Sequence, residues 1–173
     1  MAEGSVIVNT GDGKGKSTAA LGMVLRAVGH GMRVLVVHFV KAAKNTGELK
    51  ALENIEDVTV KIMGLGFLGN EKHSREEHVE AAREAYEYSK KHLSSGDFQM
   101  VVLDEIIFAV KEGLLSEKDI CELISARPVD VHLVLTGRGC PDSIAEKADI
   151  VTEMTTIKHS FDRGAAARPG VEF

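Results

Sequence analysis

The 173-residue sequence contains no tryptophan, three prolines, two cysteines and 5% aromatic residues. It has no apolar run near the roughly 18 residues that a membrane-spanning helix needs, and no basic region leads into an apolar one at its start. Cys121 and Cys140 are too far apart to form a two-residue metal or redox pair. These absences argue against a membrane protein, a secretory signal and a disulfide scaffold. We expect a cytoplasmic protein with reduced cysteines and no membrane partner.

The formal net charge is −5, and acidic and basic residues are interspersed along the chain. Because no basic block is present, we expect no nucleic-acid partner. Hydrophobic residues make up 44% of the chain, which is enough for one full-sized core. We therefore expect residues 1–173 to form a single domain.

Short β-branched runs alternate with longer helical patterns along the chain. The runs are Val6–Asn9, Arg33–Val40, Val58–Ile62, Gln99–Asp104, Val131–Thr136 and Ile150–Glu153. Helical patterns extend from about Lys16 to Val28, from a capping box at Ser74 to about Leu93, and from Ser116 to Ser125. This alternation predicts a mainly parallel sheet between two layers of helices, a three-layer α/β fold.

Residues 10–18 read Thr-Gly-Asp-Gly-Lys-Gly-Lys-Ser-Thr, between the apolar run Val6–Val8 and a helical pattern. Such a glycine-rich turn before a helix is typical of a phosphate-binding loop, in which a lysine supplies positive charge and a hydroxyl reaches Mg²⁺. Thr10 stands where the usual pattern has glycine. The expected nucleoside triphosphate site comprises Gly11, Asp12, Gly13, Lys14, Gly15, Lys16, Ser17 and Thr18.

Two further strand ends carry charged groups suited to a nucleotide site. The apolar run Val101–Leu103 ends in Asp104 and Glu105, which is how phosphate-loop proteins hold the Mg²⁺ that bridges phosphate oxygens. The apolar run Leu133–Leu135 is followed, after Thr136, by Arg138 between two glycines, and the Arg138 guanidinium matches the geometry of phosphate oxygens. We expect Asp104 and Glu105 at a metal and Arg138 as a triphosphate clamp.

Two glycine-containing segments interrupt the alternation, Lys41–Gly47 and Met63–Asn70. Both follow strands, and open parallel sheets bind ligands beyond the carboxyl ends of their strands. They are candidates for a second substrate site, and ordinary connecting loops are an equally good interpretation. Near the end of the chain, His159 and Asp162 either contact a ligand or belong to a segment that covers a sheet edge.

Several segments, in this order and spacing, resemble the P-loop ATP:corrinoid adenosyltransferases over nearly the whole chain. They are residues 10–18, Ala27–Gly31, Phe39–Lys41, Leu103–Glu105, Ala126–Pro128, Thr136–Cys140, Ala148–Asp149 and Lys158–Gly164. The resemblance also accounts for Thr10. It implies a P-loop NTPase fold of the RecA-like type, and transfer of the 5′-deoxyadenosyl group of ATP to Co(I) of a corrinoid in adenosylcobalamin biosynthesis or salvage. Triphosphate would leave as one unit, with no general base required.

The same resemblance implies roles for individual residues. Lys16 and Arg138 would neutralise the leaving triphosphate, and Ser17 with Asp104 or Glu105 would hold Mg²⁺ or Mn²⁺. The corrinoid would face Lys41, Phe67, Leu68 and His159. An expected tryptophan two residues after Phe67 is replaced by Gly69, which leaves an aromatic wall at the corrinoid half missing. A homodimer and an electron-donating reductase are the implied partners.

Two other functions remain open on the residues alone. Another P-loop phosphotransferase or ATPase would need a base near the triphosphate, and Asp104 or Glu105 could serve. A non-enzymatic ATP-binding switch would bind a partner in a nucleotide-dependent way without turnover. Release of intact triphosphate distinguishes the adenosyltransferase from both.

Overall fold

The structure, a computed structural model, describes residues 3–42, 46–66, 68–69, 72–159, 164 and 166–171. In these ranges the chain forms a six-stranded sheet of order β3-β2-β4-β5-β1-β6, in which every neighbouring pair is parallel. The strands are β1 (Val6–Thr10), β2 (Val34–His38), β3 (Val58–Ile62), β4 (Met100–Asp104), β5 (His132–Thr136) and β6 (Ile150–Glu153). The predicted parallel sheet is confirmed. The strand β5 separates the phosphate-loop strand β1 from the acidic strand β4.

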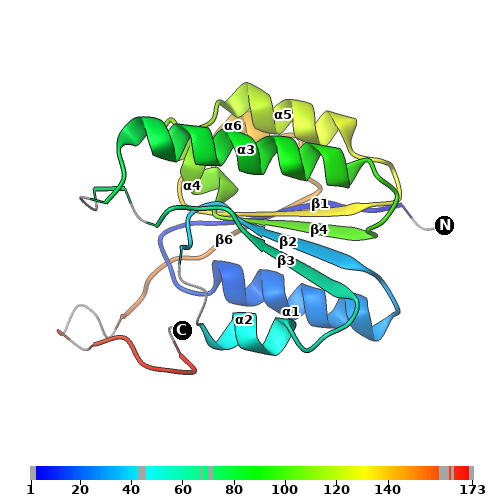
Figure 1. The fold of residues 1–173 in the computed structure, drawn as a ribbon, viewed down its shortest axis with the longest axis horizontal. Helices are drawn as coiled ribbons and strands as arrows, with labels where there is room; N and C mark the ends of the chain where they lie inside the picture. Colours follow the sequence, from blue (N-terminus) through cyan, green and yellow to red (C-terminus); the bar gives the residue numbers. More distant parts are fainter. Residues whose placement is uncertain are drawn as a thin grey trace.

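Helices cover both faces of this sheet (Figure 1). One face carries α1 (Lys16–Gly29) and α2 (Gly47–Leu52), and the other carries α3 (Arg75–Leu93), α4 (Ile106–Lys111), α5 (Glu117–Ala126) and α6 (Asp142–Ala145). The predicted three-layer α/β fold of the P-loop NTPase type is therefore confirmed. None of the helices within the described ranges is long and apolar enough to cross a membrane.

The continuous apolar strands are explained by burial on both sides. In β2, Val34 and Val36 pack in the cluster that includes Val24 of α1, whereas Leu35 and Val37 pack in the cluster on the other face, which includes helix α3. All four side chains are fully buried. Because successive strand residues point to opposite faces, two covered faces demand apolar residues at consecutive positions.

Local signals set the ends of the long helices where the sequence predicts them. Ser74 with Glu77, and Ser116 with Asp119, form complete capping boxes at the starts of α3 and α5. Three short helices, α2, α4 and α6, have no such signal and were not predicted. The second strand is also shorter than expected and ends at His38 rather than Val40, where the chain turns to pack against Gly64.

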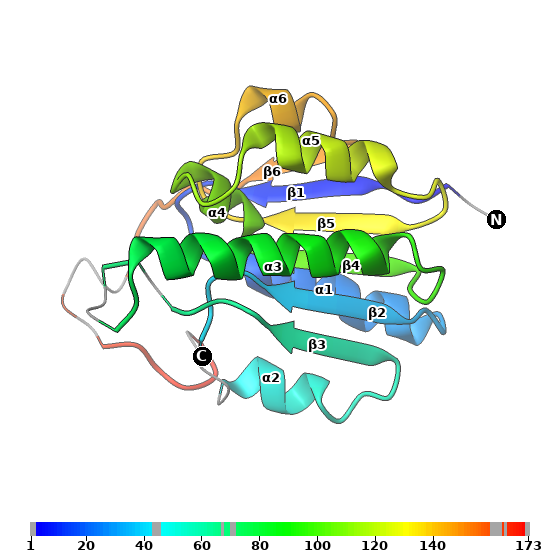
Figure 2. The same cartoon turned by 45° about the horizontal axis from the view of Figure 1, so that its top comes forward.

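The carboxyl ends of the strands all lie at one edge of the sheet (Figure 2). The phosphate loop after β1, the start of the Lys41–Gly47 segment after β2, the start of the Met63–Asn70 segment after β3, and Arg138 after β5 all leave the sheet there. The topology thus brings the predicted site segments to a single edge, as parallel α/β sheets require of a ligand site.

Candidate active site

Lys16 lies buried at the centre of the phosphate loop, with 6% of its surface exposed. Its Nζ donates hydrogen bonds to the carbonyl oxygens of Gly11 and Gly13, each at 2.7 Å. Burial lowers the pKa of Lys16, an effect that the Arg138 charge adds to and the neighbouring carboxylates oppose. The first N–H groups of α1 have no intrahelical partners, and the helix dipole is positive at this end. The loop is therefore built to receive an anion.

The phosphate loop is hydrogen-bonded to the residue that follows β6, Met154. The Gly13 N–H donates to the Met154 carbonyl at 2.7 Å, and the Met154 N–H donates to the Thr10 carbonyl at 2.9 Å. A Cβ on Gly11 would lie 2.4 Å from the Met154 oxygen, and one on Gly13 would lie 2.7 Å from it. These two glycines are thus required by backbone packing as well as by any phosphate.

Asp104, at the end of β4, is held by three side chains. Its Oδ1 accepts hydrogen bonds from Ser17 Oγ at 2.6 Å and from Thr136 Oγ1 at 2.8 Å, and its Oδ2 lies 2.8 Å from His38 Nδ1. Burial opposes ionisation of this carboxyl, but the bonds from His38 and Ser17 with the charge of Lys41 hold its pKa at about 2. Asp104 is therefore a fixed carboxylate at neutral pH.

Glu105 has a different environment from its neighbour. Its φ of 64° is the one left-handed value among the described residues other than glycine, a conformation that costs about 1–2 kcal/mol. Its N–H donates to Thr136 Oγ1 at 2.9 Å. Burial raises the pKa of its carboxyl, and Asp104 raises it further. Within the described chain, no hydrogen bond or ion pair occupies this carboxylate, which leaves it available to a ligand.

The oxygen atoms of Ser17, Asp104 and Glu105 suit a hard divalent cation such as Mg²⁺. No cluster of three or more His, Cys, Asp or Glu side chains that could hold a metal occurs in the described ranges. A cation here would therefore need ligands from a nucleotide, which is how Mg²⁺ is bound in phosphate-transfer sites. The residues present fit that arrangement.

Arg138 lies beside the phosphate loop, with its guanidinium 3.8 Å from the Asp12 carboxylate and its side chain half exposed. Gly137 before it approaches α4 so closely that a Cβ would lie 2.4 Å from the Phe108 nitrogen. Lys14, in contrast, donates to the Val171 carbonyl in the C-terminal segment. Thr18 is exposed in the first turn of α1.

The described residues expected to face a corrinoid have different surroundings in the structure. Lys41 Nζ lies 2.6 Å from Glu48 Oε1 and 4.0 Å from Asp104 Oδ2, so it belongs to the Asp104 cluster. Leu68 packs, partly buried, against the hydrophobic core, and His159 is half-buried. Phe67 and Asp162 lie outside the described residues.

Two residues of the Asp104 cluster were missed by sequence reasoning, His38 and Thr136. Each is a polar residue that ends a strand directly after an apolar run, and β2 and β5 flank β4 in the sheet. In a parallel sheet, the carboxyl ends of neighbouring strands lie side by side at one edge. Polar residues that end apolar runs were the available signal for both.

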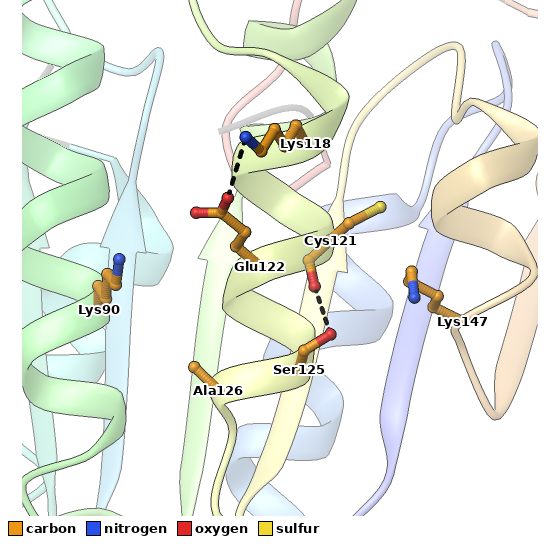
Figure 3. Close-up of a pocket in the computed structure, with 7 residues that line it drawn as sticks. All are labelled: Lys90, Lys118, Cys121, Glu122, Ser125, Ala126 and Lys147. Carbon is orange, nitrogen blue, oxygen red and sulfur yellow. Dashed lines mark hydrogen bonds and ion pairs between the residues drawn. The ribbon is translucent and has the colours of Figure 1, made fainter.

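A surface hollow of about 470 Å³ lies elsewhere, between α3, α5 and the residues after α6 (Figure 3). Its rim carries Lys90 and Lys147, and the ammonium of Lys118 pairs with Glu122 at 3.7 Å. These helices cover the face opposite α1 (Figure 1), and none of the predicted site residues lines the hollow. It is distinct from the phosphate loop.

A parallel sheet whose first strand leads into a glycine-rich loop, a buried lysine and a serine bonded to an aspartate defines a P-loop nucleotide-binding protein. The fold is similar to the crystal structure of flagellar accessory protein FlaH from Methanocaldococcus jannaschii, with a TM-score of 0.56, 13% identity and coverage of 88% of this chain and 72% of that one. At this identity the similarity shows the fold alone.

Sequence comparison defines the family. The model of the family "ATP:corrinoid adenosyltransferase BtuR/CobO/CobP" matches residues 2–173. The chain is 43% identical to a corrinoid adenosyltransferase of Pseudomonas aeruginosa, covering 98% of this chain and 84% of that protein. It is 39% identical to one of Escherichia coli strain K12, covering 98% and 86%. The chain belongs to the ATP:corrinoid adenosyltransferase family and is a transferase whose substrates are ATP and a corrinoid.

Proposed function

We propose that this protein transfers the 5′-deoxyadenosyl group from Mg-ATP to Co(I) of a corrinoid and releases intact triphosphate. The observation that carries the proposal is the pairing of Ser17 with Asp104 beside the buried Lys16, in a chain of this family.

Binding and charge neutralisation of the triphosphate fall to the phosphate loop. Lys16 would exchange its two carbonyl partners in the loop for phosphate oxygens, and Arg138 would move from Asp12 to the same anion. Both cations stabilise charge that grows on triphosphate as it leaves, so their contribution is larger in the transition state than in the ground state.

Mg²⁺ or Mn²⁺ would be held by Ser17 and Glu105 together with phosphate oxygens. Asp104 already accepts three hydrogen bonds, whereas no partner occupies the Glu105 carboxylate in the described chain. This difference supports Glu105 as a direct ligand and Asp104 as the group that fixes the Ser17 hydroxyl. The cation would supply further positive charge at the leaving group.

The bond changes balance without a proton transfer. An electron pair of Co(I) forms the cobalt–carbon bond at C5′, and the C5′–oxygen bond breaks with its electron pair going to triphosphate. Cobalt is the nucleophile, so the protein has to position the two substrates rather than supply a base. The fully bonded Asp104, with a pKa near 2, suits that positioning role and is poorly suited to accept a proton.

The corrinoid would lie at the same sheet edge, against the segments that contain Lys41, Phe67, Leu68 and His159. Because Co(I) must be generated before transfer, an electron-donating reductase is the expected partner. From the family resemblance we also propose a homodimer, and a cytoplasmic enzyme because its substrate ATP is found inside cells.

An anaerobic assay tests the proposal. The protein is mixed with chemically reduced cobalamin, ATP and either Mg²⁺, Mn²⁺ or excess chelator, and the corrinoid absorption spectrum is followed. We expect the adenosylated product with either metal and little with chelator. Absence of the cobalt–carbon product with cobalamin and its biosynthetic precursors would contradict the proposal.

A further inference from the structure

His38 stands at the junction of the two proposed substrate sites. It is the last residue of β2, it is paired in register with Asp104 of β4, and only 1% of its surface is exposed. Its side chain faces the nucleotide site and its backbone faces the segment that follows β3.

The side chain of His38 contacts the second carboxylate oxygen of Asp104, which Ser17 and Thr136 do not contact. Ser17 and Thr136 both donate to Oδ1, whereas His38 Nδ1 is the group within hydrogen-bonding distance of Oδ2, with Lys41 Nζ further away at 4.0 Å. Without His38, a buried carboxylate oxygen would lose its close partner, and the plane of the carboxylate would be fixed from one side only. The direction of the Ser17 hydroxyl depends on that plane.

The second ring nitrogen indicates that packing alone does not explain a histidine here. His38 Nε2 is buried and has no hydrogen-bond partner in the described chain. An unpaired buried polar atom is destabilising, and an aliphatic residue at the end of this apolar strand would avoid that cost. The bond to Asp104 is the contact that an aliphatic residue could not make.

The backbone of His38 holds the start of the Met63–Asn70 segment. Its carbonyl accepts hydrogen bonds from the N–H groups of both Met63 and Gly64 at 3.1 Å, and the Gly66 N–H donates to the Val40 carbonyl at 2.8 Å. A Cβ on Gly64 would lie 2.4 Å from the Val40 carbonyl carbon, so the two chains are in close contact. The segment that leads to Phe67 is thereby tied to the residue that fixes Asp104.

We infer that His38 is a positioning residue that orients Asp104, and through it Ser17, and that links this cluster to the segment leading to the corrinoid. The inference rests on the proposed function for the identity of the substrates. Outer-shell partners of metal ligands change metal affinity by about 10–100-fold when removed, and His38 would act on the Ser17 hydroxyl through Asp104. A donor at this position, rather than the imidazole itself, is what the geometry requires.

Four variants test the inference. His38→Leu and His38→Met remove the donor, His38→Asn keeps a donor at the position of Nδ1, and His30→Leu is a control at an exposed histidine beyond α1. Binding of Mn²⁺ in the presence of ATP is measured by electron paramagnetic resonance without corrinoid, and folding is monitored by circular dichroism. We expect both donor-free variants to bind Mn²⁺ about tenfold or more weakly, and His38→Asn and His30→Leu to remain within about threefold of the parent.

A second measurement separates positioning from a general structural effect. In a Ser17→Ala background, His38→Leu should weaken Mn²⁺ binding much less than in the parent, because the two side chains act through one carboxylate. Equal losses in the two backgrounds, unchanged binding in the donor-free variants, or failure of both of them to fold would overturn the inference. If the variant series behaves as expected but no corrinoid is adenosylated, the proposed function fails and the role of His38 stands.

Discussion

Replacing Lys16 with methionine should separate catalysis from stability. The substitution keeps an unbranched side chain, one heavy atom shorter, and removes the charge of Lys16 and its two bonds to the carbonyls of Gly11 and Gly13. If Lys16 meets the leaving triphosphate, the loss falls on the transition state. Removal of one such preorganised donor costs about 2.7–4 kcal/mol, which corresponds to roughly 10²–10³-fold in kcat.

The effect on folding should be small by comparison. Burial lowers the pKa of Lys16, which means that the folded state disfavours the ammonium form, and methionine removes that penalty. Two carbonyls lose a donor in exchange, at about 1 kcal/mol each. Since these effects oppose each other, we expect the Tm of Lys16→Met to stay within about 4 °C of the parent, given about 2–4 °C per kcal/mol at this size.

The assay compares Lys16→Met with Lys50→Met, which removes an exposed lysine of α2 and serves as a charge-matched control. Rates of adenosylation are measured at saturating ATP with Co(I) supplied chemically, and Tm is measured by calorimetry. The control should retain full activity. A Lys16→Met enzyme with a kcat within threefold of the parent would refute the assignment of Lys16 to the triphosphate.

Three further predictions concern single contacts. Glu105→Gln should raise the half-saturating Mg²⁺ concentration at least tenfold, and an unchanged Mg²⁺ requirement would exclude Glu105 as a ligand. Gly11→Ala should lower Tm by about 4–8 °C, because its Cβ would meet the Met154 carbonyl at a positive φ. An unchanged Tm in calorimetry would refute this close contact. Hydrogen bonding from Arg83 lowers the pKa of Asp119 to about 2, so part of the free energy of unfolding is lost as pH falls from about 4 to 2. When that free energy is measured by urea titration at several pH values, Asp119→Asn should show a weaker dependence on pH than the parent. An equal dependence on pH in the two proteins would contradict this.

The fold could be predicted from the sequence because its signals are local. Apolar runs covered on both faces, the capping boxes at Ser74 and Ser116, and the glycine-rich turn before Lys16 each act over a few residues. The short helix α4 could not be predicted, since it begins after the left-handed Glu105, whose N–H donates to Thr136 of another strand. That residues 1–173 form one domain stays a prediction.

The candidate site likewise contains residues that local sequence patterns indicate and residues that only the strand order brings together. Ser17, Asp104 and Arg138 could be proposed from the sequence because residue type and strand position indicate their chemistry, and their roles stay predictions. His38 joins the cluster through strand order, which places β2 beside β4 although 66 residues separate it from Asp104. The packing of Met154 against the loop likewise follows from the pairing of β6 with β1. Contacts of this kind depend on topology, which a single strand's sequence does not contain.

The most direct test of the account is the fate of the phosphates. The protein is incubated anaerobically with Mg-ATP and Co(I) cobalamin, and the products are followed by phosphorus NMR together with the corrinoid spectrum. The account predicts one intact triphosphate for each cobalt–carbon bond formed, with no ADP. ADP and orthophosphate without an adenosylated corrinoid would contradict it and would assign the site to a phosphoryl-transferring P-loop enzyme.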